Sequence, residues 1–318
     1  DVEARIQSDV VMRRTLFQKF GKYGIGEENP LPRPIVGSDF TACGFLFSEM
    51  LGCPVLYSSD NSPQVACANL DDDACFALQI PDFDKNDLWQ SIESQLRELK
   101  TRYGYVECHM NLMGVQNIAL DLRGQTLFCD YYDETSPAEH LLDVICGTLL
   151  EGSRRMHLYT DALSSGVTNI VRHICPEVFV TSNCTVEMVS QQIYEEFLLK
   201  HDIRLAEAFP PFGIHHCGKT MEHVVEGYSK VPHLKFVEVG AFSDLAAVAR
   251  ALPGDILINA RYSPVRLMTV CEQDLYNELK EMTRIVPGSR LSISCVGIDS
   301  TVPDDRVQMF LEICKKLL

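Results

Sequence analysis

The stretch from Glu177 to Cys295 decides the fold, because it repeats one pattern five times. Each repeat is a short apolar run followed by a longer amphipathic run, which predicts a strand and then a helix. The apolar runs are EVFVT (177–181), FGIHH (212–216), KFVEV (235–239), DILIN (255–259) and LSISC (291–295). The predicted helices cover residues 188–208, 220–229, 243–251, 272–284 and 304–317. Successive β-then-α units are typical of a parallel sheet.

Two architectures place helices around a parallel sheet: an open, doubly wound sheet and a closed (β/α)8 barrel. The barrel usually needs about 250 residues plus insertions, and the chain has 318. A dinucleotide-binding open sheet would carry GxGxxG after its first strand, and the sequence contains no such motif. We therefore expect an α/β chain folded as a (β/α)8 TIM barrel. In either architecture, ligands bind at the carboxyl ends of the strands.

The first half of the chain has weaker patterns. Helical spacing of apolar residues predicts a helix over residues 2–20, and the Gly- and Pro-rich residues 21–42 are expected to be irregular. We expect one domain over residues 1–318, with residues 1–50 as a helical and irregular N-terminal extension. Further predicted strands are 54–57, 105–108 and 126–129, and further predicted helices are 85–101, 137–150 and 161–174.

Charge and cysteine content exclude several classes of protein. The chain has 28 Lys and Arg against 44 Asp and Glu, a formal net charge of −16. Such an acidic surface repels nucleic acid and anionic lipid. No apolar run is long enough for a membrane span, and the first residues lack the plan of a secretory signal. The 13 cysteines include no CxxC pair, so we expect reduced thiols in a cytoplasmic protein.

Polar residues gather where the predicted strands end, and one pattern among them is typical of a metal site. His215 and Cys217 are two positions apart, so on a strand they point to the same face. Cys295 ends a later strand that a closed barrel can bring near them. One imidazole and two thiolates with an open fourth position form a catalytic zinc ligand set. The alternative is structural: His215 forms hydrogen bonds in the barrel mouth and Cys217 packs.

These residues also carry a resemblance. The segment Ile-His-His-Cys-Gly-Lys at 214–219 resembles the I-H-x-C-G-N segment of the uroporphyrinogen decarboxylase superfamily. Within that superfamily, the zinc-dependent corrinoid methyltransferases have a second Cys after a long gap, as Cys295 follows Cys217 here. Residues 189–197 and 292–295 are also similar to segments of that group, although Gln191 and Gln192 stand where it usually has Ser-Pro-Glu. The resemblance covers most of residues 100–318.

The resemblance implies a (β/α)8 barrel and a methyl transfer reaction. It implies zinc bound by His215, Cys217 and Cys295, with Glu187 and Cys184 as reserve ligands, because some relatives use other ligand sets. The methyl group would move between a corrinoid (cobalamin) carried by a partner protein and a small thiol or a methoxylated substrate. The methylcobamide:coenzyme M methyltransferases and the O-demethylase methyltransferases are the most similar groups. A homodimer is compatible with exposed helices.

Strand-end positions also suggest which residues contact the substrate. We expect this role for five residues: His109, Asn183, Glu238, Asn259 and Arg261. Two other functions stay open. A metal-independent decarboxylase of a porphyrinogen-like substrate needs several arginines in its pocket, and the arginine-rich segment of that enzyme is missing here. A non-catalytic binding barrel would have scattered, non-converging ligands.

Overall fold

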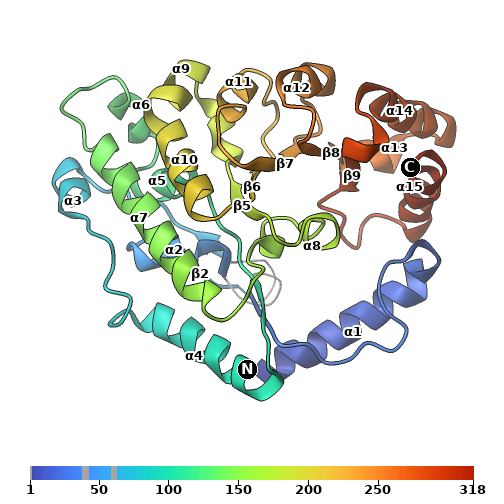
Figure 1. Ribbon diagram of the computed structural model, residues 1–318, viewed down its shortest axis with the longest axis horizontal. Helices are drawn as coiled ribbons and strands as arrows, with labels where there is room; N and C mark the ends of the chain where they lie inside the picture. The colour runs from blue at the N-terminus through green and yellow to red at the C-terminus, as the bar shows by residue number, and fades with distance from the viewer. Residues whose placement is uncertain (1, 38–42, 59–62) are drawn as a thin grey trace.

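A computed structural model of the chain describes residues 2–37, 43–58 and 63–318. Its largest sheet has five parallel strands in the order β5-β6-β7-β8-β9. The strands are β5 (Phe179–Ser182), β6 (Phe212–His216), β7 (Leu234–Val239), β8 (Leu257–Tyr262) and β9 (Leu291–Cys295). Each lies within three residues of the run that predicted it, so the repeated pattern gives this sheet correctly (Figure 1).

A helical segment follows each of these strands, and those between β5 and β9 form the crossovers that parallel pairing needs. They are α9 (Gln191–Ile193), the π-helix η5 (Tyr194–Leu198), α10 (Leu199–Ala208), α11 (Val225–Tyr228), α12 (Leu245–Ala251), α13 (Pro264–Thr269), α14 (Glu272–Ile285) and α15 (Asp304–Leu317). Short 3-10 helices η4 (Cys184–Met188) and η6 (Gly288–Arg290) stand just after β5 and just before β9. The predicted helices over 272–284 and 304–317 are confirmed almost to the residue.

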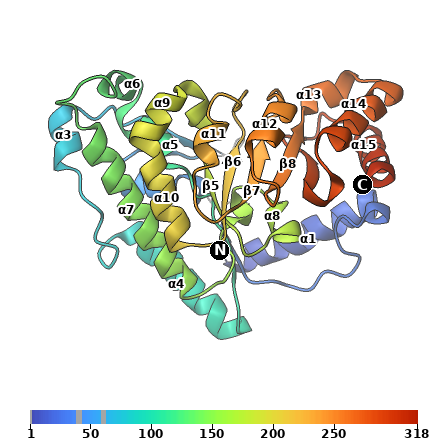
Figure 2. The ribbon, with the colours of Figure 1, turned by 45° about the horizontal axis from the view of Figure 1, so that its top comes forward.

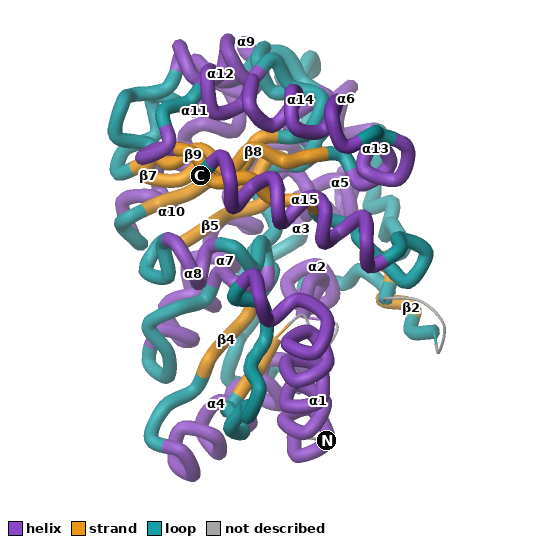
Figure 3. The backbone as a smooth tube through the Cα atoms, turned by 90° about the vertical axis from the view of Figure 1, so that its right-hand side faces the viewer, coloured by secondary structure: helices purple, strands orange, loops and turns teal. Residues whose placement is uncertain are grey.

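The N-terminal half is mainly helical. Its helices are α1 (Val2–Phe20), α2 (Leu46–Met50), α3 (Asp72–Ala77), α4 (Asp87–Tyr103), α5 (Val115–Arg123), α6 (Thr126–Asp130), α7 (Ala138–His157) and α8 (Val171–Ile174), with 3-10 turns η1 (Gly21–Tyr23), η2 (Cys43–Phe45) and η3 (Ser164–Gly166). Its strands are β1 (Ile35–Gly37), β2 (Val55–Leu56), β3 (Gln64–Val65) and β4 (Glu107–His109). Figure 3 shows α1, α4 and β4 together, apart from the larger sheet.

Two sequence predictions in this half are wrong. Residues 126–129 belong to helix α6 and not to a strand. Their apolar run is too short for its periodicity to separate the two states. The continuous helix predicted over 161–174 is broken into η3 and α8. In the Gly- and Pro-rich segment, residues 35–37 form β1, and residues 38–42 lie outside the described part of the chain.

The strands of the described residues form separate sheets, and a closed barrel is not shown. β1 pairs in parallel with β4, and β2 forms an antiparallel pair with β3. A single bridge from Met113 to Ser182 links the segment after β4 to β5. Among the described residues the strands form three separate sheets, and β1 and β9 are not paired. β1 and β4 have only three residues each, which limits the ladder that could close a ring. The α/β class is therefore confirmed, and the closed barrel stays a prediction.

The two faces of the large sheet pack against different partners. Phe212, Ile214 and Val237 lie in the main hydrophobic core, which also takes in α7, α10 and the helices of the N-terminal half. α7 and α10 run side by side, tied by an ion pair between Asp143 and Arg204 (Figure 2). The opposite face carries a small apolar cluster of Val171, Val178, Val180 and Phe236 where the strands begin. The carboxyl ends of this second face carry polar side chains instead.

The end of α1 that is remote from the N-terminus lies beside α15, the last helix. Lys19 and Lys22, near the end of α1, pair with Asp304 and Glu312 of α15 (Figure 1). No helix within residues 2–37, 43–58 and 63–318 is both long enough and apolar enough to cross a membrane.

Candidate metal centre

Five polar residues form one row across the large sheet. The parallel register pairs Ser182 with His215, His215 with Glu238, Glu238 with Asn259, and Asn259 with Ser292. Residues that pair directly across strands share a face, so their side chains form a continuous polar row; we call these five residues the polar row. Glu238 and Asn259 are fully buried. Burying such groups is costly unless they are paired, which marks the row as a candidate site.

A group of metal-binding side chains lies at one end of the polar row. Candidate ligand atoms of Cys184, His215 and Cys217 all lie within 4.8 Å of one another, and no other such group occurs within the described ranges. His215 is the penultimate residue of β6, Cys217 directly follows that strand, and Cys184 begins η4, one residue after β5. Cys184 and Cys217 are joined as a disulfide. The expectation of reduced thiols is therefore wrong for this pair.

The loops that carry the two cysteines are held firmly together. The backbone N–H of Asn183 donates to the carbonyl of His215 at 2.8 Å, and that of Lys219 donates to the Glu187 carboxylate. A Cβ on Gly218 would come within 2.9 Å of the Cys184 carbonyl oxygen. The close approach of the two loops thus requires glycine at this position, and it fixes the spacing of the cysteines.

A buried carboxylate orients the histidine. Oε2 of Glu238 accepts a hydrogen bond from Nδ1 of His215 at 2.7 Å, which leaves Nε2 of the imidazole with its lone pair. Burial opposes ionisation of Glu238, but His215 and then Arg261 together hold its pKa below the usual value. Arg261 Nε lies 3.5 Å from the other carboxylate oxygen. A carboxylate behind a ligating histidine is typical of metal sites.

Cys295 lies away from this group for two reasons. β9 is separated from β6 by β7 and β8, and adjacent strands are about 4.8 Å apart. Cys295 pairs with Tyr262, and both belong to the apolar cluster formed with α13, α14 and α15. Ser292 and Ser294 contact Asn259, so alternation along the strand turns Cys295 to the opposite face. Burial raises the pKa of its thiol to about 11.

Of the two reserve ligands, Cys184 and Glu187, the structure brings only the first to the metal group. Cys184 belongs to the group, whereas the Glu187 carboxylate accepts the backbone N–H of Lys219 and is not a member. The sequence pointed to His215 and Cys217 through their two-residue spacing. It could not rank Cys184 above Cys295, because the ranking depends on which strands are neighbours.

The predicted substrate residues lie in three places. Glu238 and Asn259 are in the polar row, and Arg261 follows them on β8. Asn183 faces the other way, and its side chain donates to the buried Asp202 of α10 at 2.7 Å. His109 is buried on β4, where Nε2 lies 3.1 Å from the Glu107 carboxylate. The structure thus places three of the five predicted residues in the polar row or on its face of β8.

Sequence reasoning missed a buried network behind the two loops. Tyr194 donates a hydrogen bond to Asp202 at 2.7 Å, and Tyr228 contacts Nδ1 of His216 at 2.8 Å. Burial raises the pKa of Asp202 to about 6 and lowers that of His216 to about 4. Tyr194 begins the π-helix η5, a local irregularity that is frequent at functional sites. The only sequence signal was an Asp in an otherwise amphipathic helix.

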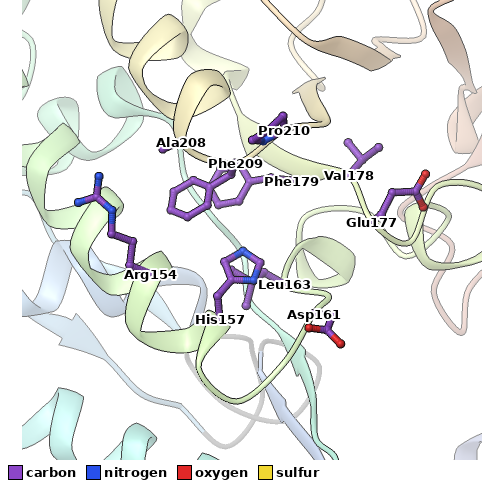
Figure 4. Close-up of a pocket in the computed structure, with 10 residues that line it drawn as sticks. All are labelled: Arg154, His157, Asp161, Leu163, Glu177, Val178, Phe179, Ala208, Phe209 and Pro210. Atoms are coloured by element: carbon purple, nitrogen blue, oxygen red, sulfur yellow. The ribbon is translucent and has the colours of Figure 1, made fainter.

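A separate cavity of about 370 Å³ opens where β5 and β6 begin. The ring of Phe209 stacks on His157 and on Phe179, with centroid distances of 5.4 and 4.7 Å (Figure 4). Arg154 and Glu177 line it as well. None of the metal group or the polar row lines this cavity, so it is not part of the candidate centre.

Comparison with known proteins shows the fold and no closer kinship. No protein-family model matches the sequence, and no curated protein matches it. A methyltransferase from Methanosarcina mazei has a similar structure, with a TM-score of 0.64 and 13% identity over 97% of this chain and 85% of that one.

Two methionine synthases are also similar in structure. A B12-independent methionine synthase from a Shewanella species has a TM-score of 0.54 and 11% identity, covering 99% of this chain and 90% of that one. A putative vitamin-B12-independent methionine synthase from Listeria monocytogenes has a TM-score of 0.52 and 12% identity, covering 98% and 87%. At such identities the likeness is one of fold.

Proposed function

We propose that the chain is a zinc-dependent methyltransferase. It would move a methyl group between a corrinoid carried by a partner protein and a small thiol or methoxylated substrate. The observation that carries the proposal is the group of Cys184, His215 and Cys217. Two sulfurs and one imidazole nitrogen form a known catalytic zinc set that leaves one position open. A cytoplasmic location and completion of the strands into a barrel belong to the same proposal.

The fold adds support at a coarser level. The similar structures include one described as a methyltransferase and two described as methionine synthases, all reactions of methyl groups. A shared fold does not by itself define an activity. The chemistry is therefore argued from the side chains.

In the proposed reaction, each residue near the metal group has its own role. When bound, zinc would act as a Lewis acid that lowers the pKa of a thiol or polarises a methoxyl oxygen. Glu238 engages Nδ1 of His215, so Nε2 is the nitrogen that would be available to the metal. Cys184 replaces the Cys295 of the sequence prediction as third ligand. Arg261 stands at the end of β8, 18% exposed, where its guanidinium can receive an anionic group of the substrate.

The decarboxylase alternative gains no support. That enzyme needs a basic pocket with several arginines. Among the described residues, Arg261 is the one arginine with an ion pair to the polar row, which it forms with Glu238. Of the adjacent arginine pairs in the sequence, Arg13 is tied to Asp9 and Glu27, and Arg155 to Asp84 and Glu151.

Zinc binding by reduced protein tests the proposal. The chain is reduced, incubated with zinc, desalted and assayed for metal, together with Cys184→Ser, Cys295→Ser and, as a control, the exposed Cys129→Ser. We expect about one zinc per chain in the parent, Cys129→Ser and Cys295→Ser, and loss in Cys184→Ser. Loss of zinc in Cys295→Ser alone would instead support the ligand set predicted from the sequence: His215, Cys217 and Cys295. No zinc in the reduced parent would reject a zinc enzyme.

Methyl transfer itself can be followed with free methylcob(III)alamin, whose absorbance changes when a thiolate takes the methyl cation and leaves cob(I)alamin. Thiols of equal size and different charge serve as probes: mercaptoacetate, mercaptoethanol and cysteamine. We expect mercaptoacetate to be preferred, and Arg261→Gln to lose the preference. Equal rates with all three thiols would remove Arg261 from the substrate site.

A further inference from the structure

We propose that Cys184 and Cys217 form a reversible redox modification site. A peroxide oxidises the two thiols to a disulfide, and a dithiol reduces it. The inference rests on the proposed function in one respect: the sulfurs that form the disulfide are those that would hold the metal. Oxidation and metal binding therefore exclude each other, and the oxidation state of this pair decides whether the centre can be loaded.

The backbone positions allow the disulfide without rearrangement. The Cα atoms of Cys184 and Cys217 are 5.1 Å apart, inside the usual range for a disulfide. The contacts of Asn183, Gly218 and Lys219 already fix the two loops against each other. Conversion between dithiol and disulfide then needs little more than side-chain rotation. Cys184 and Cys217 are the one pair joined as a disulfide among the described residues.

Metal binding requires the sulfurs of Cys184 and Cys217 to lie close together, as the disulfide does. His215 Nδ1 is occupied by Glu238, and the sulfurs lie beside the imidazole in the group. A thiolate sulfur bound to zinc sits about 2.3 Å from the metal, and a sulfur already joined to another sulfur offers no thiolate for that bond. One pair of loops thus supports two arrangements of the same atoms, which compete.

The oxidation balances as a two-electron reaction. One thiolate attacks a peroxide oxygen and forms a sulfenic acid while the O–O bond breaks. The second thiol then attacks that sulfur, the S–S bond forms and water leaves. In sum, two thiols and hydrogen peroxide give one disulfide and two waters. A dithiol such as dithiothreitol returns the pair by thiol–disulfide exchange and becomes a cyclic disulfide.

Mass and metal content, measured on the same samples, test the inference. Reduced and zinc-loaded protein is treated with hydrogen peroxide, and the intact mass, the disulfide-linked peptides and the released zinc are measured. We expect a loss of about two mass units, the two hydrogen atoms removed in forming one disulfide. A single linked peptide pair containing Cys184 and Cys217 and release of the bound zinc should accompany it, with full recovery after dithiothreitol. Cys129→Ser should behave like the parent.

The variants and outcomes separate the two proposals. Cys184→Ser and Cys217→Ser should each take up peroxide oxygen without forming the linked peptide; a pair that links elsewhere overturns the inference. Zinc retained after the disulfide has formed also overturns it and leaves the metal centre intact. A reduced chain that binds no zinc but still forms the Cys184–Cys217 link contradicts the proposed enzyme, not the redox pair.

Discussion

The large sheet and the N-terminal region build their interiors in different ways. In the sheet, five strands of four to six residues pair in register, so one polar residue from each strand lies in a single row. In residues 2–37, 43–58 and 63–157, strands have two or three residues, and the interior is packed by helices. The comparison teaches that a candidate site forms where the backbone ladder brings polar residues into register, while the helical region supplies stability.

Truncating a buried side chain in the helical region should have the largest effect on stability and should not change zinc binding. Leu96 is fully buried on α4, and Leu96→Ala should lower the free energy of unfolding by about 2–5 kcal/mol. The sole tryptophan, Trp89, lies on the same helix and reports unfolding by fluorescence. Zinc bound per folded chain should not change. A parallel fall in zinc would show that the two regions are not separable.

The buried network gives a pH-dependent contrast. Folding raises the pKa of Asp202 from 3.8 to about 6, so its stabilising contribution is full below pH 4 and is lost as the pH rises through 6. Relative to Asp202→Asn, the parent should therefore lose about 3 kcal/mol of stability over that interval. Urea unfolding at several pH values measures this.

The comparison with Asp202→Asn is internally controlled. The lowered pKa of His216 acts with the opposite sign, since stability is lost as the pH falls toward 4, but His216 is present in both proteins and its effect cancels. A difference in unfolding free energy that is flat between pH 4 and 7 would contradict a raised pKa for Asp202.

Removing the charge behind the histidine should have a moderate effect on the centre. Glu238→Gln keeps the size of the side chain but gives Nδ1 of His215 a weaker partner. We expect zinc affinity to fall by about 10- to 100-fold, measured by competition with a chelator. Asn259→Ser, one strand further along the polar row, serves as the matched control and should fall less. An equal fall in zinc affinity in both variants would mean that Glu238 acts through packing of the polar row and not through its bond to His215.

The smallest effect is expected where the regions touch at the surface. Lys22 and Glu312 join η1, directly after α1, to α15, with half-exposed side chains. Exposed ion pairs contribute little, so Lys22→Met should leave the melting temperature unchanged within error. A clear drop would mean that this contact holds the two regions together.

The sequence predicted the sheet well because each strand and helix repeats the same local pattern. It also pointed to His215, Cys217, Glu238 and Asn259, since all lie at or just after the carboxyl ends of the predicted strands. It failed where the answer depended on neighbours in space. Cys295 and Cys184 both follow strands, and only the order and pleat of the sheet decide that Cys184 faces His215. Asp202 and the Cys184–Cys217 pair were hidden for the same reason.

The central claim is that the metal group contains two sulfurs and one histidine nitrogen. X-ray absorption at the zinc edge of the reduced, loaded protein counts these ligands directly. We expect two sulfur atoms at about 2.3 Å and nitrogen or oxygen at about 2.0 Å, with the same two sulfurs in Cys295→Ser, which keeps its zinc. A first shell without sulfur, or one that loses a sulfur in Cys295→Ser, would contradict it.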